Sequence, residues 1–296
     1  MIAVLTSWRA LLVREYREHR VAFLYVPVGI LVALALASLA SLTGSHTRMF
    51  LAAVSPDSLK LFEFGTLLIF ALWFAYLVVT LFFYFGDAFS ADRRSNAMFF
   101  WKSMPVSDLK ILSSKFLAGV TIFPALVLAV AIVAALAFLV VIEVGEQIIG
   151  LPPASFVTLV TSLGQIIVFA VVNLALSLLW YAPFMAWVGG LSTVFGRWSL
   201  PLAFVIPGLA SVIENIVFLG QGPRGGYIWG YLGQRWRFGL DGADYSRMLM
   251  TDAPFSAATY IAALWSRIDW WSMAGGLIFA VIVTWLASEY RRRRIV

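Results

Sequence analysis

The strongest constraint in this chain is a series of apolar runs long enough to cross a lipid bilayer. A helix needs about 20 predominantly apolar residues to span the hydrocarbon core. Hydrophobic residues make up 62% of the chain and charged residues only 12%, which is more apolar surface than a soluble core buries. We therefore expect an all-α polytopic membrane protein, with 1–296 as a single transmembrane domain. The predicted spans are 22–42, 64–85, 116–142, 156–195, 200–219 and 271–289.

Basic residues decide how the longest run, 156–195, is divided, because its length also suits two short spans. Six spans place fourteen of the 21 Lys and Arg residues on the face that carries both termini and seven on the other. A seventh span would move the arginine run 291–294 to the outer face, against the positive-inside rule. We therefore predict six spans, both termini in the cytoplasm, and one long helix over 156–195 with a kink near Pro183.

Two segments outside the spans are predicted to lie at the membrane surface. In 1–20, apolar residues recur on one helical face with arginines off it, which predicts an amphipathic interfacial helix. Segment 221–270 is aromatic and punctuated by glycine, so it predicts short interfacial or re-entrant helices on the outer face before the last span.

The polar loop 87–115 is built like a docking element. Ser90 can cap a short helix with Asp92 in its first turn, Pro105 ends that helix, and Ser107 can cap the next one. The first helix is amphipathic, because helical spacing relates Arg94, Ala97, Met98 and Trp101. Such a helix lies flat, and it either rests on lipid headgroups or is held out to a soluble partner.

Four polar residues near or inside the spans are candidates for a transport pathway or a dimer interface. Asn173 and Ser177 are four residues apart, so they share a helix face and can bond across a helix interface or line a polar path. Glu214 and Asn215 lie near the end of the fifth predicted span. A carboxylate there is costly unless it faces water or a partner, although snorkelling to the interface is an alternative.

The chain offers little enzymatic chemistry. It has no cysteine, its two histidines, His19 and His46, lie at opposite ends of the first span, and no phosphate-binding loop is present. We therefore expect no cofactor or metal in this chain. The net charge of +6 gathers at the ends of spans, which indicates membrane lipids and topology rather than nucleic acid as the reason for it.

The whole chain resembles the permease subunits of ABC transporters of the type-2 exporter family. The likeness lies in the span order and in the pattern Asp92-Arg93-Arg94, Trp101 to Ser107 and Lys115. In that family the loop after the second span is a cytoplasmic coupling helix that docks on the nucleotide-binding subunit. The resemblance implies that the docking residues here are Asp92, Arg93, Arg94, Met98, Trp101 and Lys102.

The resemblance also implies partners, because this chain has no ATPase domain of its own. A cytoplasmic ABC ATPase subunit would bring ATP and magnesium, and a second copy or a sister permease would complete a dimer in the bacterial inner membrane. The aromatic spans suit a hydrophobic or amphipathic substrate such as a lipid-like molecule, peptide or drug. The alternative is a non-transport assembly or resistance factor that docks a soluble partner through loop 87–115. A membrane-embedded enzyme fits less well, because paired catalytic carboxylates and metal ligands are missing.

Overall fold

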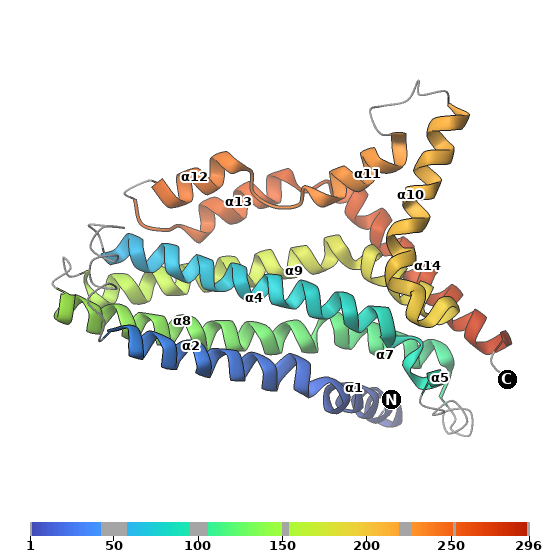
Figure 1. The fold of residues 1–296 in the computed structure, drawn as a ribbon, viewed down its shortest axis with the longest axis horizontal. Coiled ribbons are helices and arrows are strands. Elements are labelled where there is room, and N and C mark those ends of the chain that lie inside the picture. Colours follow the sequence, from blue (N-terminus) through green and yellow to red (C-terminus); the bar gives the residue numbers. More distant parts are fainter. Residues whose placement is uncertain are drawn as a thin grey trace.

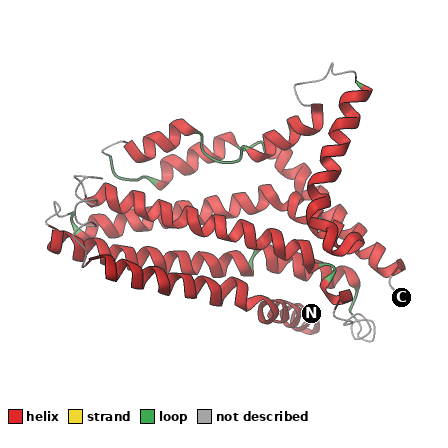
Figure 2. Ribbon diagram, viewed as in Figure 1, coloured by secondary structure: helices red, strands yellow, loops and turns green. Residues whose placement is uncertain are grey.

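The computed structural model describes six stretches of the chain: 2–42, 58–94, 106–149, 154–218, 226–250 and 253–294. These stretches are almost entirely helical and contain no strand (Figure 2). Five helical segments among them are long and apolar enough to cross a membrane. The all-α membrane class predicted from the sequence is therefore confirmed, whereas six separate spans are not.

Four long helical stretches run side by side and form the bundle (Figure 1). The first stretch consists of α1 (Ile2–Arg20), the π-helical turn η1 (Val21–Tyr25) and α2 (Val26–Leu42), which follow one another without a break. The second is α4 (Ser58–Ala88), the third joins α7 (Asp108–Val120) to α8 (Ile122–Ile149), and the fourth is α9 (Phe156–Phe195). The predicted interfacial helix 1–20 thus runs directly into the first span.

α9 is one helix of 40 residues with the predicted bounds, and Pro183 lies inside it. The last helix, α14 (Trp270–Arg294), packs along α9 through small side chains. Ala182 and Ala186 of α9 are buried with Ala280 of α14, so the two helices approach closely. This contact fixes the position of the C-terminal part of α14, whose residues form part of the site described below.

The fifth predicted span, 200–219, is not confirmed as a separate span. It corresponds to α10 (Ser199–Val217), which follows α9 after the 3-10 turn η2 (Gly196–Trp198) and forms one candidate segment with it. Contacts at its start set its direction, because the Ser199 hydroxyl donates to the Gly86 carbonyl at 2.7 Å. From there α10 runs steeply away from the bundle (Figure 1).

Three short helices occupy the predicted outer segment: α11 (Gly226–Trp236), α12 (Gly242–Met250) and α13 (Ala257–Arg267). Short helices in this part of the chain are therefore confirmed, while their side of the membrane stays a prediction. The three lie along one side of the bundle (Figure 1), and α13 packs on α9. Buried Glu63 of α4 secures this segment by accepting the backbone N–H of Phe255 at 2.8 Å.

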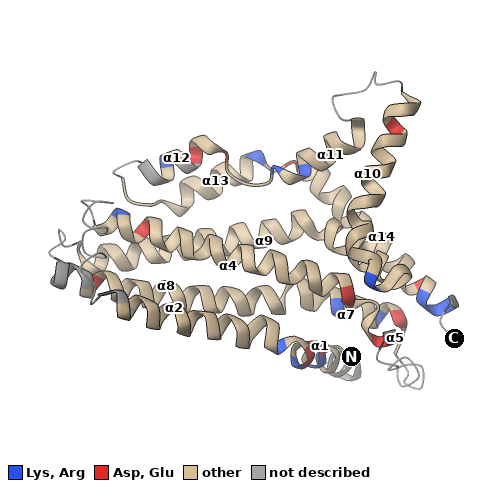
Figure 3. Ribbon diagram, in the orientation of Figure 1, with Lys and Arg blue, Asp and Glu red and all other residues tan. Residues whose placement is uncertain are grey.

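α1 and the C-terminal part of α14 lie at the same end of the bundle (Figure 1). Figure 3 shows that charged residues gather toward the ends of the bundle helices, whereas their middle parts carry almost none. This arrangement suits the prediction that both termini share one side of the membrane.

The membrane sidedness can be tested with single cysteines, since the chain has none of its own. Trp198→Cys and Arg293→Cys place thiols at the predicted inner face, and Trp236→Cys places one in the predicted outer segment; all three side chains are exposed. We expect an impermeant maleimide to label only Trp236→Cys in intact cells and all three variants after permeabilisation. Labelling of Arg293→Cys in intact cells would contradict cytoplasmic termini.

Candidate functional site at the base of the 87–115 loop

The loop begins with a tight turn after α4. The backbone N–H and the hydroxyl of Ser90 both donate to the Asp87 carbonyl, at 3.0 and 3.1 Å. The hydroxyl therefore closes this turn instead of accepting a helix N–H as an N-cap. Helix α5 (Ala91–Arg94) follows directly and is the described part of the predicted coupling helix. At the far end of the loop, Ser107 accepts from the Lys110 N–H at 3.3 Å, which confirms the predicted cap of the next helix.

Asp92, the second residue of α5, is bound by cations from three other helices. Its carboxylate accepts from Arg14 of α1 at 3.1 Å and from Arg291 of α14 at 3.0 Å. The ammonium group of Lys115 in α7 lies 3.8 Å away. The Asp92 side chain is only 1% exposed, so it lies inside the protein and these cations are what make its burial tolerable.

Two further carboxylates complete the charge balance. Lys115 Nζ lies 2.9 Å from Glu15 of α1, and Arg291 Nε lies 2.8 Å from Asp108 in the first turn of α7. Three positive and three negative side chains therefore meet where α1, α5, α7 and α14 come together. We call this set the buried ion cluster: Arg14, Glu15, Asp92, Asp108, Lys115 and Arg291.

A tyrosine from a fifth helix joins the buried ion cluster. The hydroxyl of Tyr84 in α4 lies 2.9 Å from the Lys115 carbonyl and 3.2 Å from the Glu15 carboxylate. Its ring packs edge-on against Phe123 of α8. Six helices, α1, α4, α5, α7, α8 and α14, thus contribute either a charge or a buried contact to the same small region.

The electrostatics favour an ionised Asp92. Burial alone would raise the pKa of this carboxyl, but attraction to Lys115 and Arg291 outweighs burial and holds the pKa below its ordinary value. The stabilisation from this group is therefore fully present above the ordinary carboxyl range and is lost as the pH falls through the lowered pKa.

One of the predicted docking residues is buried. The Asp92 side chain points into the buried ion cluster and is 1% exposed, and its docking role stays a prediction. Arg93 and Arg94 are the last residues of α5, and their side chains lie outside the described residues. Met98, Trp101 and Lys102 lie outside them entirely, so their docking role stays a prediction.

The candidate pathway residues form local contacts. The Ser177 hydroxyl donates to the Asn173 carbonyl on its own helix at 2.6 Å, so this bond does not cross a helix interface. Glu214 accepts the backbone N–H groups of Tyr227 and Ile228 and thereby caps the start of α11. In the described stretches, no hydrogen bond or ion pair joins Asn173 or Ser177 to Glu214 or Asn215. Asn215 donates to the Ser211 carbonyl at 2.8 Å.

Sequence reasoning missed Arg291, because it looks like one member of a topogenic arginine run. A signal was nevertheless present, since Arg291 continues a stripe of small residues on α14. Ala280, Thr284 and Ala287 precede it at intervals of four, three and four residues, and all of them are buried. An arginine in line with the packed face of a span is more apt to pair inside than to lie on lipid headgroups.

Glu15, Glu18 and His19 bring three ligand atoms within 4.8 Å of one another, close enough to suggest a metal. Basic side chains already bind both carboxylates, because Lys115 lies 2.9 Å from Glu15 and Arg14 lies 2.7 Å from Glu18. We therefore assign these groups to the charge network at this end of the bundle.

No family model, no curated protein and no solved structure matches this chain. The fold and the charge pattern define its class as a polytopic, helical membrane protein. Buried ion pairs of Asp92 hold the start of its 87–115 loop against the bundle.

The buried ion cluster predicts a large stability difference between neighbouring arginines. Arg291→Gln leaves Asp92 and Asp108 short of a cation, and removing one partner of a buried pair costs about 3–5 kcal/mol. Arg292→Gln is the matched control, because Arg292 is 69% exposed and should cost about 0–1 kcal/mol. Both can be measured by denaturant unfolding in detergent micelles. Equal stability of the two variants would show that the buried ion cluster contributes nothing.

The Glu214 cap predicts a local effect in α11. Glu214→Ala removes the acceptor of two N–H groups, which is worth about 0.5–2 kcal/mol at a helix start. Hydrogen exchange at Tyr227 and Ile228 should accelerate, while Glu214→Gln should have a smaller effect because its amide oxygen still accepts. Asn215→Ala serves as the control and should leave both amides unchanged. Protection that persists in Glu214→Ala would contradict the capping role.

Proposed function

We propose that this chain is the membrane-spanning permease subunit of an ATP-driven exporter, and that a separate cytoplasmic ABC ATPase subunit docks on loop 87–115. The observation that supports this most directly is the anchoring of Asp92. This residue, the second of α5 near the start of the loop, is bound at once to α1, α7 and α14. A loop that only rests on lipid has no need for such an anchor.

The anchor suits mechanical coupling. A displacement of α5 relative to the bundle would separate Asp92 from its cations, and breaking a buried pair costs several kcal/mol. A force on the loop is therefore transmitted to α1, α7 and α14 more readily than it detaches α5. ATP-driven closure of a docked partner would in this way move the spans and open or squeeze a path for substrate.

Partner chemistry follows from the sequence of the loop. The pair Arg93 and Arg94 precedes apolar residues that end at Trp101, which suits a cleft with an acidic rim and an apolar floor. α10 exposes Phe204, Leu209 and Ile213, and this apolar surface is available to a second copy or a sister permease. The proposed place is the bacterial inner membrane with both termini cytoplasmic, and the proposed substrate is hydrophobic or amphipathic.

The second candidate function is a non-transport assembly or resistance factor, because an anchored loop would serve any soluble partner equally well. The two differ in one observable. A permease subunit copurifies with a protein that hydrolyses ATP, whereas an assembly factor brings a partner without that activity.

Substitutions in the loop test the docking. Trp101→Ala removes an aromatic anchor of the kind that is often worth about 2 kcal/mol or more at an interface, which corresponds to roughly 30-fold in affinity. Replacing Arg93 and Arg94 with Glu reverses the charge of the same surface. We expect both variants to insert and fold normally and to lose the copurifying ATPase activity from native membranes.

Trp236→Ala is the matched control, because Trp236 is 83% exposed and belongs to α11, far along the chain from the loop. It should retain the ATPase. Unchanged ATPase recovery with both loop variants would leave a helix that rests on lipid, and recovery of a partner without ATPase activity would favour the assembly factor.

A further inference from the structure

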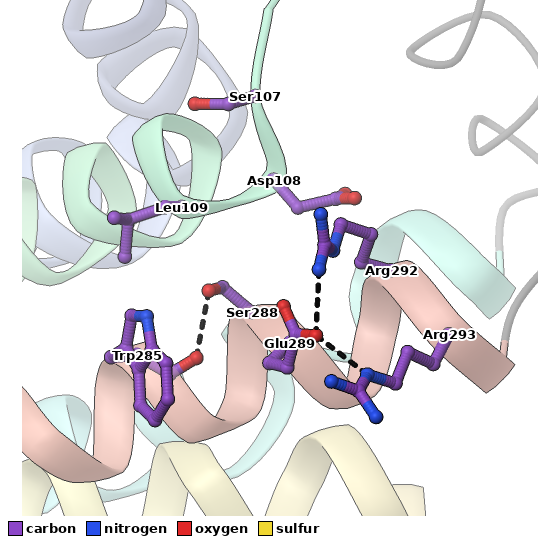
Figure 4. A pocket seen from close by; sticks show the side chains of 8 residues that line it. All are labelled: Ser107, Asp108, Leu109, Trp285, Ser288, Glu289, Arg292 and Arg293. Atoms are coloured by element: carbon purple, nitrogen blue, oxygen red, sulfur yellow. Dashed lines mark hydrogen bonds and ion pairs between the residues drawn. The ribbon is translucent and has the colours of Figure 1, made fainter.

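A pocket of about 470 Å³ opens beside the buried ion cluster, between the start of α7 and the last turns of α14 (Figure 4). The N-cap residue and first two residues of α7 contribute three of its lining residues, and α14 contributes the other five. They are Ser107, Asp108 and Leu109, and Trp285, Ser288, Glu289, Arg292 and Arg293.

The pocket charges outside the buried ion cluster, those of Glu289, Arg292 and Arg293, sum to +1. Arg292 and Arg293 are 69% and 73% exposed, and both donate to the same oxygen of Glu289, at 2.7 and 2.6 Å. One carboxylate therefore faces two guanidinium groups, each of which has further N–H donors. Asp108 also lines the pocket and attracts Arg292, but its charge is balanced within the buried ion cluster by Arg291 at 2.8 Å.

The start of α7 adds backbone donors. This helix has 13 residues, and its first intrahelical bond runs from Ile111 N–H to the Ser107 carbonyl. Ser107 Oγ takes the Lys110 N–H, whereas the N–H groups of Asp108 and Leu109 have no acceptor within the helix. Two arginines and the positive end of a helix dipole therefore border one cavity, a combination that suits an anionic group such as a phosphate.

An apolar track leads away from the pocket along α14. Ile278, Val281 and Trp285 follow at intervals of three and four residues, and all three are exposed on a segment that qualifies as a membrane span. Tryptophan is enriched where a span meets the headgroup region. The track thus offers a place for an acyl chain directly beside the charged pocket.

We propose that this pocket binds the phosphodiester headgroup of an anionic phospholipid, with an acyl chain along the exposed track of α14. The net charge of +1 matches a headgroup that carries −1, such as phosphatidylglycerol, better than a zwitterionic one. This site is independent of any ATPase partner. A lipid bound here would link the start of α7 to the end of α14, the same two helices that Arg291 joins in the buried ion cluster.

Native mass spectrometry of the purified protein, titrated with phosphatidylglycerol, measures the affinity of the first bound lipid. The double variant Arg292→Gln with Arg293→Gln should weaken it about tenfold or more, since each basic residue near a membrane surface contributes a factor of about five. The matched control, Arg9→Gln with Arg17→Gln, removes the same charge from exposed positions of α1 at the same end of the bundle, and it should change affinity less than twofold.

Further arms identify the ligand. Phosphatidylethanolamine should bind the wild type about tenfold more weakly than phosphatidylglycerol. Trp285→Ala should weaken phosphatidylglycerol and leave inorganic phosphate unaffected. Equal losses in both double variants, or equal affinity for the two lipids, would overturn the proposal. The proposal would also be overturned if the Arg292→Gln, Arg293→Gln variant kept its lipid affinity but lost a copurifying protein. The pocket would then be a contact site for that protein.

Discussion

The ionised Asp92 carboxylate is the constraint on which this end of the molecule depends. A buried carboxylate is tolerable only when cations and hydrogen bonds replace water, and the cations here come from α1, α7 and α14. None of these helices can shift alone without leaving a charge unpaired. The start of the loop and the three helices therefore behave as one unit, which is the property that a docking platform requires.

Packing inside the bundle brings that unit together. Small residues let α14 lie close against α9, and the same face of α14 then carries Arg291 to the loop. The arginines that follow point elsewhere, because helical rotation places Arg292 and Arg293 on the accessible side with Glu289. One arginine run thus supplies a buried ion pair and an exposed basic pocket within a single turn.

Carboxylates also organise the segment 226–267, although by a different means. Glu63 on α4 accepts the N–H of Phe255, and Glu214 on α10 accepts the N–H groups at the start of α11. Backbone donors at helix starts and in turns have no partner of their own, so a carboxylate from a neighbouring helix satisfies them and fixes the connection. Arg235 of α11 supplies a donor instead of an acceptor. Its side chain is fully buried and donates to the Trp180 carbonyl of α9 at 2.8 Å.

The sequence by itself determined the membrane class, the bounds of α9 and the cap at Ser107, because hydrophobic length and capping are properties of neighbouring residues. It did not determine that α10 leaves the bundle, that Asp92 is buried or that Arg291 pairs with it. The start of α10 is held by a contact between residues 113 positions apart, and Asp92 is bound by residues 78 and 199 positions away. A local sequence pattern carries no information about which distant groups will meet. Only tertiary packing decided that a predicted docking residue would lie at the centre of a buried ion cluster.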